Sequence, residues 1–423
     1  MIKYTTYFLF FIIVSSSCTS GTQQKKEKDR VDNKAVLAQK SPKKSNGIEQ
    51  LAVFSECSDY DNNLSSVASE VKFIQLEIKP PINDFMTFDV EISDEYIFLT
   101  GLTQISQYDR NGRYIKNIGS HGKGPKEFFR LTPPLQLDRK NKLIYAFDIT
   151  YKKIVVYNFE GEFIRKISLN SESGCFEIID STVIALRQMF YERYRPDCKS
   201  IRFIDYSGKQ LNAYPSHLYP LSKERFENYG TEESFLWKHN GTVYYLEYGA
   251  DTVFQVIKNS LVPARVLTGK LKLDKDEFFR KDRGNNKLDI SSYIMRPNGG
   301  VFESDKFIIF KLSSNKEVFY MVYNKSTMQF HRTFYKDASS TGKGSIKMNY
   351  FTDDLVSGLS FNPQYQSQGK AISLVSAIDI YNRKQVILDY IANHPSEEAE
   401  KLKLMVQNIT EMDNPIVMIA KFK

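Results

Sequence analysis

The sequence predicts an all-β protein built from repeated units of four short strands. The first observation is that apolar and polar residues alternate in many short segments rich in Ile, Val, Tyr and Phe, with turn residues between them. Segments with this pattern lie at residues 72–78, 143–147, 154–157, 243–248, 307–311 and 318–323. Helical periodicity is nearly absent before residue 376. The second observation is a degenerate repeat, which sets the size of the unit.

The repeat is a turn in which Asp or Asn precedes Gly by three residues. Its three copies are Asp109 with Gly112, Asn158 with Gly161, and Asp205 with Gly208. In such a hairpin the Asp or Asn side chain closes the turn and glycine supplies the positive φ before the outgoing strand. The turn recurs after 49 and then 47 residues. A period of about 40–50 residues with four strands per unit is the size of a β-propeller blade.

The C-terminal region predicts two helices and a last strand. Residues 377–393 and 396–409 have helical spacing, and Pro395 separates them. The residues expected on the apolar face of the first segment are Ile380, Val386, Ile387, Tyr390 and Ile391. Residues 415–422 form a strand after the Asn-Pro turn. We expect this strand to close the ring by pairing with an early strand near residues 71–78.

The N-terminus predicts export and lipid attachment. Lys3 precedes an eight-residue apolar run at 7–14, which is too short to cross a bilayer but suits a signal peptide. Three serines and Cys18 follow, and this stretch resembles the lipobox of bacterial lipoproteins, although Ser15 stands where Leu is commonest. Residues 1–17 are then the signal peptide, and Cys18 carries the acyl chains, palmitate among them, that anchor the protein. The alternative is an ordinary secretory signal in which Cys18 is incidental.

Residues 18–47 are predicted to be a basic tether before a domain at 48–423. Between residues 25 and 44, eight basic residues face three acids, so five of the eight formal positive charges lie here. The folded part is therefore close to neutral, which argues against a nucleic-acid-binding face. The segment is too polar to fold alone. It is either a solvated linker or a contact for anionic lipid or cell-wall polymer.

No local motif predicts catalysis, a cofactor or a metal. The five histidines lack metal-ligand spacing, and the glycine-rich segment 119–124 lacks the Gly-Lys-Ser/Thr ending of a phosphate-binding loop. We interpret that segment as a turn between blades. Ser120 and His121 are adjacent and therefore point apart, which disfavours a nucleophile and base. Asp353 and Asp354 are interpreted as a loop or turn.

Two cysteines and one loop are candidate sites. Cys175 and Cys198 are a candidate disulfide, because an exported protein meets an oxidising compartment. The loop at 188–199 is dense in Tyr and Arg, residue types that anchor interfaces. The candidate interface residues are Tyr191, Arg193, Tyr194 and Arg195. The alternative is a loop that only connects two strands and covers one face.

Three segments carry a family resemblance. Gly119–Phe128 reads GSHGKGPKEF, Asp251–Phe254 reads DTVF, and Asp413–Lys421 reads DNPIVMIAK. With these, the chain resembles the six-bladed β-propeller lipoproteins of Bacteroidetes, whose blades are similar to NHL repeats. The resemblance implies six four-stranded antiparallel blades and anchoring at the outer membrane. Residues 19–24 lack an acidic run that resembles a surface-export signal, which favours the periplasmic face.

Two classes of function agree with these observations. The first is a non-enzymatic module that binds or scaffolds a protein, peptide or glycan partner in the cell envelope. The second is a propeller enzyme, such as a polysaccharide lyase or glycoside hydrolase, with catalytic residues converging from several blades. Fold alone does not separate them. The enzyme requires His, Tyr, Arg and carboxylate side chains gathered in the central channel, whereas the scaffold does not.

Overall fold

The computed structural model describes residues 47–54, 60–82, 87–169, 175–187, 199–216, 234–247, 250–269, 294–295, 300–313, 317–334 and 347–423. All of them belong to one compact unit, Lys40–Lys423. The predicted signal peptide, Cys18 and almost all of the predicted tether lie outside the described residues.

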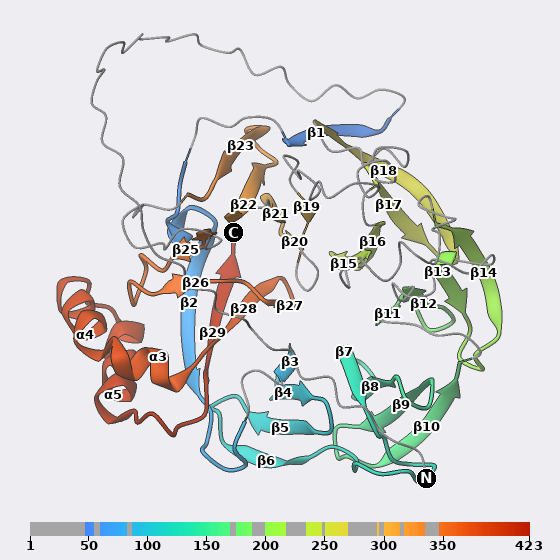
Figure 1. Ribbon diagram of the computed structural model, residues 1–423, viewed down its shortest axis with the longest axis horizontal. Coiled ribbons are helices and arrows are strands. Elements are labelled where there is room, and N and C mark those ends of the chain that lie inside the picture. The colour runs from blue at the N-terminus through green and yellow to red at the C-terminus, as the bar shows by residue number, and fades with distance from the viewer. Residues whose placement is uncertain are drawn as a thin grey trace, which may run out of the picture. The chain divides into compact units, whose positions relative to one another are not determined.

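The unit is a six-bladed β-propeller (Figure 1). In each blade the first strand lies beside the central channel, and the following strands step outward. Blade 1 contains β3 (Thr87–Ile92), β4 (Tyr96–Gly101), β5 (Ile105–Asp109) and β6 (Tyr114–Asn117). Blade 2 contains β7 (Leu131–Asp138), β8 (Leu143–Asp148), β9 (Lys153–Asn158) and β10 (Phe163–Ser168). Blade 3 contains β11 (Cys175–Ile178), β12 (Ile184–Arg187), β13 (Lys199–Ile204) and β14 (Gln210–Pro215).

Blades 4 to 6 follow the same plan with additions. Blade 4 contains β15 (Phe235–His239), β16 (Thr242–Leu246), β17 (Thr252–Ile257) and β18 (Ser260–Gly269). Blade 5 contains β20 (Val301–Glu303), β21 (Phe307–Ser313), β22 (Glu317–Asn324) and β23 (Gln329–Arg332), with short β19 (Ile294–Met295) on β21 and β24 (Lys347–Asn349) parallel to β22. A two-stranded sheet of β25 (Phe351–Thr352) and β26 (Ser360–Phe361) follows. Blade 6 contains β27 (Tyr365–Ser367), β28 (Lys370–Val375), β29 (Ile416–Phe422) and β2 (Ala68–Gln75).

The hydrophobic core lies between neighbouring blades. In β8 of blade 2, Ile144 and Ala146 pack in the cluster shared with blade 1, whereas Tyr145 and Phe147 pack in the cluster shared with blade 3. Strands whose two faces are both buried are therefore apolar at nearly every position. Each large apolar side chain buried in this way contributes about 1.5–3 kcal/mol relative to exposure. Each blade face is buried only where the neighbouring blade covers it, so the blades are stable as a closed ring.

The last strand closes the ring as the sequence predicts. β29 lies between β28 and β2, and its antiparallel register with β2 pairs Val71 with Ala420 and Gln75 with Ile416. Blade 6 thus combines three strands from the C-terminus with its outermost strand from the N-terminal part of the chain. This pairing joins the two ends of the repeat array and leaves no open seam between blades 6 and 1.

The predicted helical region lies between β28 and β29. It contains α3 (Ala377–Asn382), α4 (Lys384–Asn393) and α5 (Glu397–Asn408). The hydroxyl groups of Ser376 and Ser396 accept hydrogen bonds from the first turns of α3 and α5. The inner faces of the helices pack against blades 5 and 6. The expected face is wrong at Val386, which is 71 % exposed, whereas Ile380, Ile387 and Ile391 of the same predicted face are buried.

The repeated turns are hairpins between the third and outer strands of blades 1 to 3. Gly112, Gly161 and Gly208 have φ of +84°, +84° and +87°. Asp109 Oδ1 accepts the backbone N–H groups of Asn111 and Arg113, at 2.8 and 3.0 Å. The predicted turn chemistry is therefore confirmed. The segment 119–128 is likewise a turn between blades, since it connects β6 to β7 and buries Phe128.

The N-terminal part of the domain also contacts two other blades. β1 (Glu49–Phe54) pairs in parallel with β18, the outer strand of blade 4, and gives that blade a fifth strand (Figure 1). Tyr60 then bridges to Arg332 of blade 5 before the chain enters β2. Residues 49–54 and 60–75 therefore contact blades 4, 5 and 6 on their outer side. The sequence did not predict this fifth strand.

Candidate functional site

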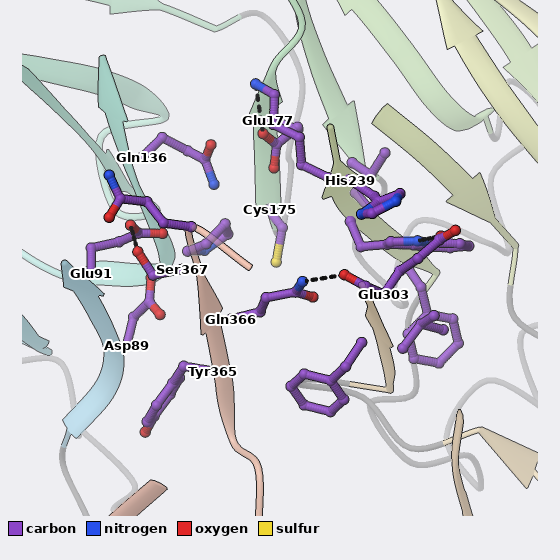
Figure 2. Close-up of a pocket in the computed structure, with 18 of the residues that line it drawn as sticks. Asp89, Glu91, Gln136, Cys175, Glu177, His239, Glu303, Tyr365, Gln366 and Ser367 are labelled. Atoms are coloured by element: carbon purple, nitrogen blue, oxygen red, sulfur yellow. Dashed lines mark hydrogen bonds and ion pairs between the residues drawn. The ribbon is translucent and has the colours of Figure 1, made fainter. Parts of the chain in front are cut away.

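The central channel holds a cavity of about 470 Å³, within the usual size range of small-molecule pockets. The innermost strand of every blade lines it: β3, β7, β11, β15, β20 and β27. An innermost strand has a blade neighbour on one edge only, so its other edge faces the channel. Figure 2 shows side chains from these strands pointing toward the cavity.

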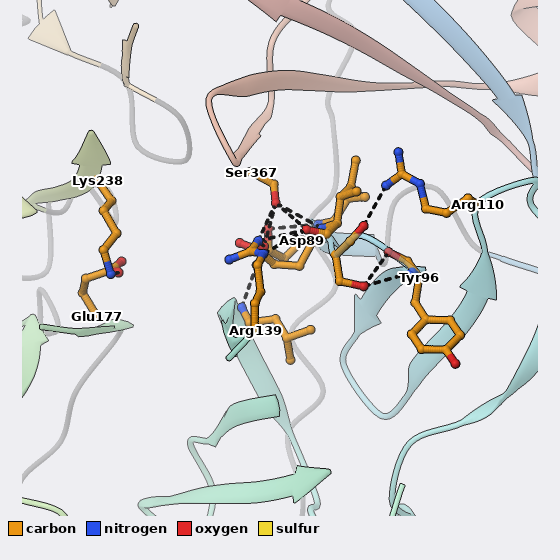
Figure 3. A network of polar contacts seen from close by, with 12 residues as sticks. Asp89, Tyr96, Arg110, Arg139, Glu177, Lys238 and Ser367 are labelled. Atoms are coloured by element: carbon orange, nitrogen blue, oxygen red, sulfur yellow. Dashed lines mark hydrogen bonds and ion pairs between the residues drawn. The ribbon is translucent and has the colours of Figure 1, made fainter. Parts of the chain in front are cut away.

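One group of side chains joins blades 1, 2 and 6 at the wall of the cavity. Arg139 follows β7 and places Nη2 2.7 Å from Oε2 of Glu91 on β3. The Ser367 hydroxyl, on β27, donates to the same Glu91 oxygen at 2.8 Å and accepts from Arg139 Nη2 at 2.9 Å. Figure 3 shows Ser367 and Arg139 meeting beside Asp89. These contacts connect β3, the end of β7 and β27 at the cavity wall.

Asp89 lies two residues before Glu91 and is only 7 % exposed. Its carboxylate accepts the backbone N–H of Leu135 in blade 2 at 2.6 Å and that of Val90 at 2.9 Å. Burial and the negative charge of Glu91 raise the pKa of Asp89 well above its ordinary value. Burial also raises the pKa of Glu91, partly offset by Arg139. Arg139 thus pairs with Glu91, whereas burial and the charge of Glu91 favour the protonated form of Asp89.

Glu177 of β11 supplies a third carboxylate. Its side chain is largely buried, and the Lys238 Nζ of β15 lies 3.9 Å from Oε1. Burial raises the pKa of Glu177 to about 7, with Lys238 opposing the shift and Glu91 adding to it. This carboxyl group therefore changes its protonation near neutral pH. Figure 3 shows Glu177 and Lys238 across the channel from the Asp89 group.

The carboxylate of Glu303, in the wall formed by blades 4 and 5, is neutralised by two cations that do not line the cavity. The Glu303 side chain is fully buried and accepts from Trp237 Nε1 at 2.9 Å. Arg265 and Lys325 approach the same carboxylate at 2.7 and 2.8 Å. Burial alone would raise the pKa of Glu303, but these cations outweigh it and hold the pKa below its ordinary value. Glu303 is thus an ionised, paired group, and Trp237, Val301 and Phe302 line the cavity beside it.

His239 and Cys175 also line the cavity. Burial and the nearby Lys325 charge lower the pKa of His239, so the imidazole is neutral at pH 7. Cys175 is buried, and Arg187 donates a hydrogen bond to its sulfur. Cys198 lies outside the described residues, so the disulfide between Cys175 and Cys198 stays a prediction.

The candidate interface residues Tyr191, Arg193, Tyr194 and Arg195 also lie outside the described residues. Their segment connects β12 to β13, from Arg187 to Lys199. In the register of blade 3, Arg187 is opposite Cys175. Within the described ranges, no three His, Cys, Asp or Glu side chains gather as a metal site would require. No helix in those ranges is long and apolar enough to cross a membrane.

Sequence reasoning missed the channel carboxylates. A signal for them exists, because Phe is followed by an acid at the start of three blades: Phe88-Asp89, Phe176-Glu177 and Phe302-Glu303. An acid inside an otherwise apolar strand is costly unless it faces a polar cavity or a partner. An acid directly after Phe in an apolar strand would therefore have identified the innermost strands of these three blades.

The fold and the cavity define a six-bladed β-propeller with a ligand-sized central channel. The chain belongs to the family described as Domain of unknown function (DUF4934), whose model matches residues 51–421. No curated protein matches the sequence.

One of the solved structures similar to this chain has the same fold at low identity. A putative exported protein from Bacteroides fragilis is 16 % identical, with a TM-score of 0.65 over 88 % of this chain and 99 % of its own. A DUF4221 family member from Bacteroides vulgatus is 12 % identical, with a TM-score of 0.45 over 84 % and 97 %. BamB from Moraxella catarrhalis is 11 % identical, with a TM-score of 0.37 over 62 % and 66 %. At 16 % identity the likeness to the Bacteroides fragilis protein concerns the fold alone.

Proposed function

We propose that this protein is a cell-envelope lipoprotein whose propeller binds a peptide or glycan ligand in its central channel. The observation that carries the proposal is the cavity of about 470 Å³, to which the inner strands of all six blades contribute. A closed ring gives a rigid cavity, so little ordering free energy is lost when a ligand enters. The likeness to a putative exported protein agrees with an envelope location.

The anchor in this proposal is Cys18, with the signal peptide at 1–17 and the basic tether at 18–47. The location is the periplasmic face of the outer membrane. Metabolic labelling with a palmitate analogue should mark the wild-type protein and leave Cys18→Ala unlabelled and released from the membrane fraction. Equal labelling of both proteins would refute the anchor. Digestion of the propeller by protease added to intact cells would refute the periplasmic location.

A bulky side chain placed in the channel tests whether the ligand binds there. Gln136 lies on β7 at the cavity wall, so Gln136→Trp should obstruct the cavity while the outer faces of the blades stay unchanged. The matched control is Gln385→Trp, which makes the same change on an exposed position of α4. Thermal-shift screening of peptides and oligosaccharides should find ligands for the wild type and the control. Equal binding by Gln136→Trp would place the site outside the channel.

A second function, a polysaccharide lyase or glycoside hydrolase, is favoured by one observation. Arg139, His239, Tyr365 and a carboxylic acid with a pKa near 7 line the same cavity. Binding remains the better-supported function, because Arg139 and Glu91 already engage each other and Ser367. Incubation with envelope polysaccharides and mass spectrometry of the products separates the two. Shortened or unsaturated products that disappear in Glu177→Gln would establish the enzyme.

A further inference from the structure

We propose that two neighbouring turns at one end of blade 2 bind an acidic polysaccharide, a chain of uronic acid rings. The first turn is residues 119–130, which lead into β7, and the second is residues 148–153, from the end of β8 to the start of β9. None of these residues lines the channel cavity. The surface is therefore separate from the channel ligand of the proposed function.

Hydrogen bonds hold the two turns side by side. Asp148 accepts the backbone N–H groups of Phe129 and Arg130, at 2.9 and 3.3 Å. Lys153 Nζ donates to the carbonyl oxygen of Glu127 at 2.6 Å. The exposed side chains of the two turns are therefore neighbours on one surface.

The acids of this surface are engaged by backbone groups, whereas most of its cations are exposed. Asp148 is fully buried, and Glu127 accepts the backbone N–H of Gly124 at 2.7 Å. The exposed cations are Lys123, Lys126, Arg130 and Lys152. Together the two turns hold five cations and two acids, a net charge of +3. The outer surface is therefore positive and attracts an anionic polymer.

A further cation extends this surface. Burial lowers the pKa of Lys153, Asp148 opposes the shift, and the charge of Lys166 adds to it. Lys166 is exposed on β10, the strand next to β9. Cations from both turns and from β10 thus repel one another, and a bound carboxylate relieves that repulsion.

Three aromatic rings lie among the cations. His121 stacks on Phe129, with ring centroids 5.2 Å apart and an angle of 26° between the rings. Phe129 meets Tyr151 edge-to-face, with centroids 6.1 Å apart. Tyr151 is 43 % exposed and His121 is also exposed, so this row of rings reaches the surface. The face of an aromatic ring is negative and attracts the C–H groups on the face of a sugar ring.

The mixture of rings and cations favours an acidic polysaccharide over other anionic partners. Each ring of a uronic acid chain carries one carboxylate, and the guanidinium of Arg130 matches a carboxylate through two parallel N–H groups. An acidic peptide offers the charge without the rings. A bilayer requires apolar side chains that insert into it, whereas Phe129 is only partly exposed.

The charge and the rings of the partner are tested separately with soluble probes. The probe is a galacturonate octamer, and its matched partner is the methyl-esterified octamer, which keeps the rings and loses the charge. Binding is measured by isothermal titration calorimetry with the full-length protein in detergent. Galacturonate should bind at least tenfold more tightly than its ester and than octaglutamate. Its affinity should fall as salt rises, because salt screens exposed charges.

Paired lysine variants test the location. Lys123→Gln with Lys126→Gln should weaken galacturonate binding at least fivefold. The matched control, Lys140→Gln with Lys306→Gln, removes two exposed lysines elsewhere and should bind like the wild type. Melting curves check that each variant folds.

A ring variant tests the stacking contact. Tyr151→Ser should weaken binding of the octamer at least threefold without changing the charge of the surface. The matched control is Tyr381→Ser, at a tyrosine of α3 that is 41 % exposed, and it should bind like the wild type.

Equal affinity for galacturonate and its ester would overturn the site, and so would octaglutamate binding as tightly as galacturonate. Absence of galacturonate binding at millimolar concentration would also overturn it, whether or not the protein binds dihexanoyl phosphatidylglycerol, the probe for a lipid partner. Gln136→Trp, which changes the channel, should bind the octamer like the wild type. Loss of binding in that variant would place the saccharide in the channel, which keeps the proposed function and rejects this surface.

Discussion

Glu177→Gln should stabilise the protein above neutral pH and have little effect in acid. The unfolded carboxyl group has a pKa of about 4.5, whereas burial raises the folded value to about 7. Between these values the folded protein holds a proton that the unfolded chain has lost, so folding becomes less favourable as pH rises. The stability associated with protonated Glu177 is complete below the unfolded pKa and is lost as pH rises through about 7.

The magnitude follows from the shift. A difference of roughly 2.5 pKa units lowers the free energy of unfolding of the wild type by about 3 kcal/mol at pH 8 and by less than about 1 kcal/mol at pH 5. Glutamine resembles the protonated acid and does not ionise, so the variant avoids this cost. For a domain of roughly 375 residues, an unfolding entropy of about 0.8 kcal/mol/K converts the gain to about 4 °C in Tm.

The assay is differential scanning calorimetry of the wild type, Glu177→Gln and the exposed control Glu411→Gln between pH 5 and pH 8. The Tm difference between Glu177→Gln and the wild type should grow steadily over that interval. The control should follow the wild type at each pH. A variant that is less stable than the wild type at pH 8, or a difference independent of pH, would refute the reasoning about this buried carboxyl group.

Three further predictions concern stability and use denaturant unfolding or melting. Arg265→Met should cost about 3–5 kcal/mol, because it leaves Glu303 fully buried with one cation fewer; a loss below about 1 kcal/mol would contradict the pairing. Gly112→Ala should destabilise more than Gly161→Ala, since both have positive φ but only Gly112 would place a Cβ against a backbone carbonyl of β2; equal losses would refute the contact. Deletion of residues 413–423 should abolish cooperative unfolding by removing β29, and an unchanged melting transition would refute ring closure.

Much of the fold was predictable because its signals are local. The turn at Asp109–Gly112 needs a carboxylate and a glycine three residues apart, and the structure has the expected backbone there. The helical region after residue 376 and the closing strand were also predicted, since helical spacing is readable in one segment, although the first predicted helix is divided at Arg383 into α3 and α4. The orientation of Val386 was not, because the apolar face of a short helix is set by the blades against which it packs.

The channel was not predictable in the same way. Asp89, Glu177 and Glu303 are separated by roughly a hundred residues each, and no spacing rule brings them together. The pairing of β1 with blade 4 was also missed, since a parallel partner more than 200 residues away leaves no local trace. Both features depend on where the ring closes and not on any single segment.

The sequence by itself determined the strands, the repeated turns, the C-terminal helices and the way the last strand completes the ring. These depend on the side-chain period of a strand, on glycine's access to positive φ and on helix capping, all of which act over a few residues. Only the tertiary structure decided that acids from separate blades share one cavity and that Glu177 titrates near neutral pH. Burial and charge pairing act through space, so their effect exists only once the six blades surround the channel.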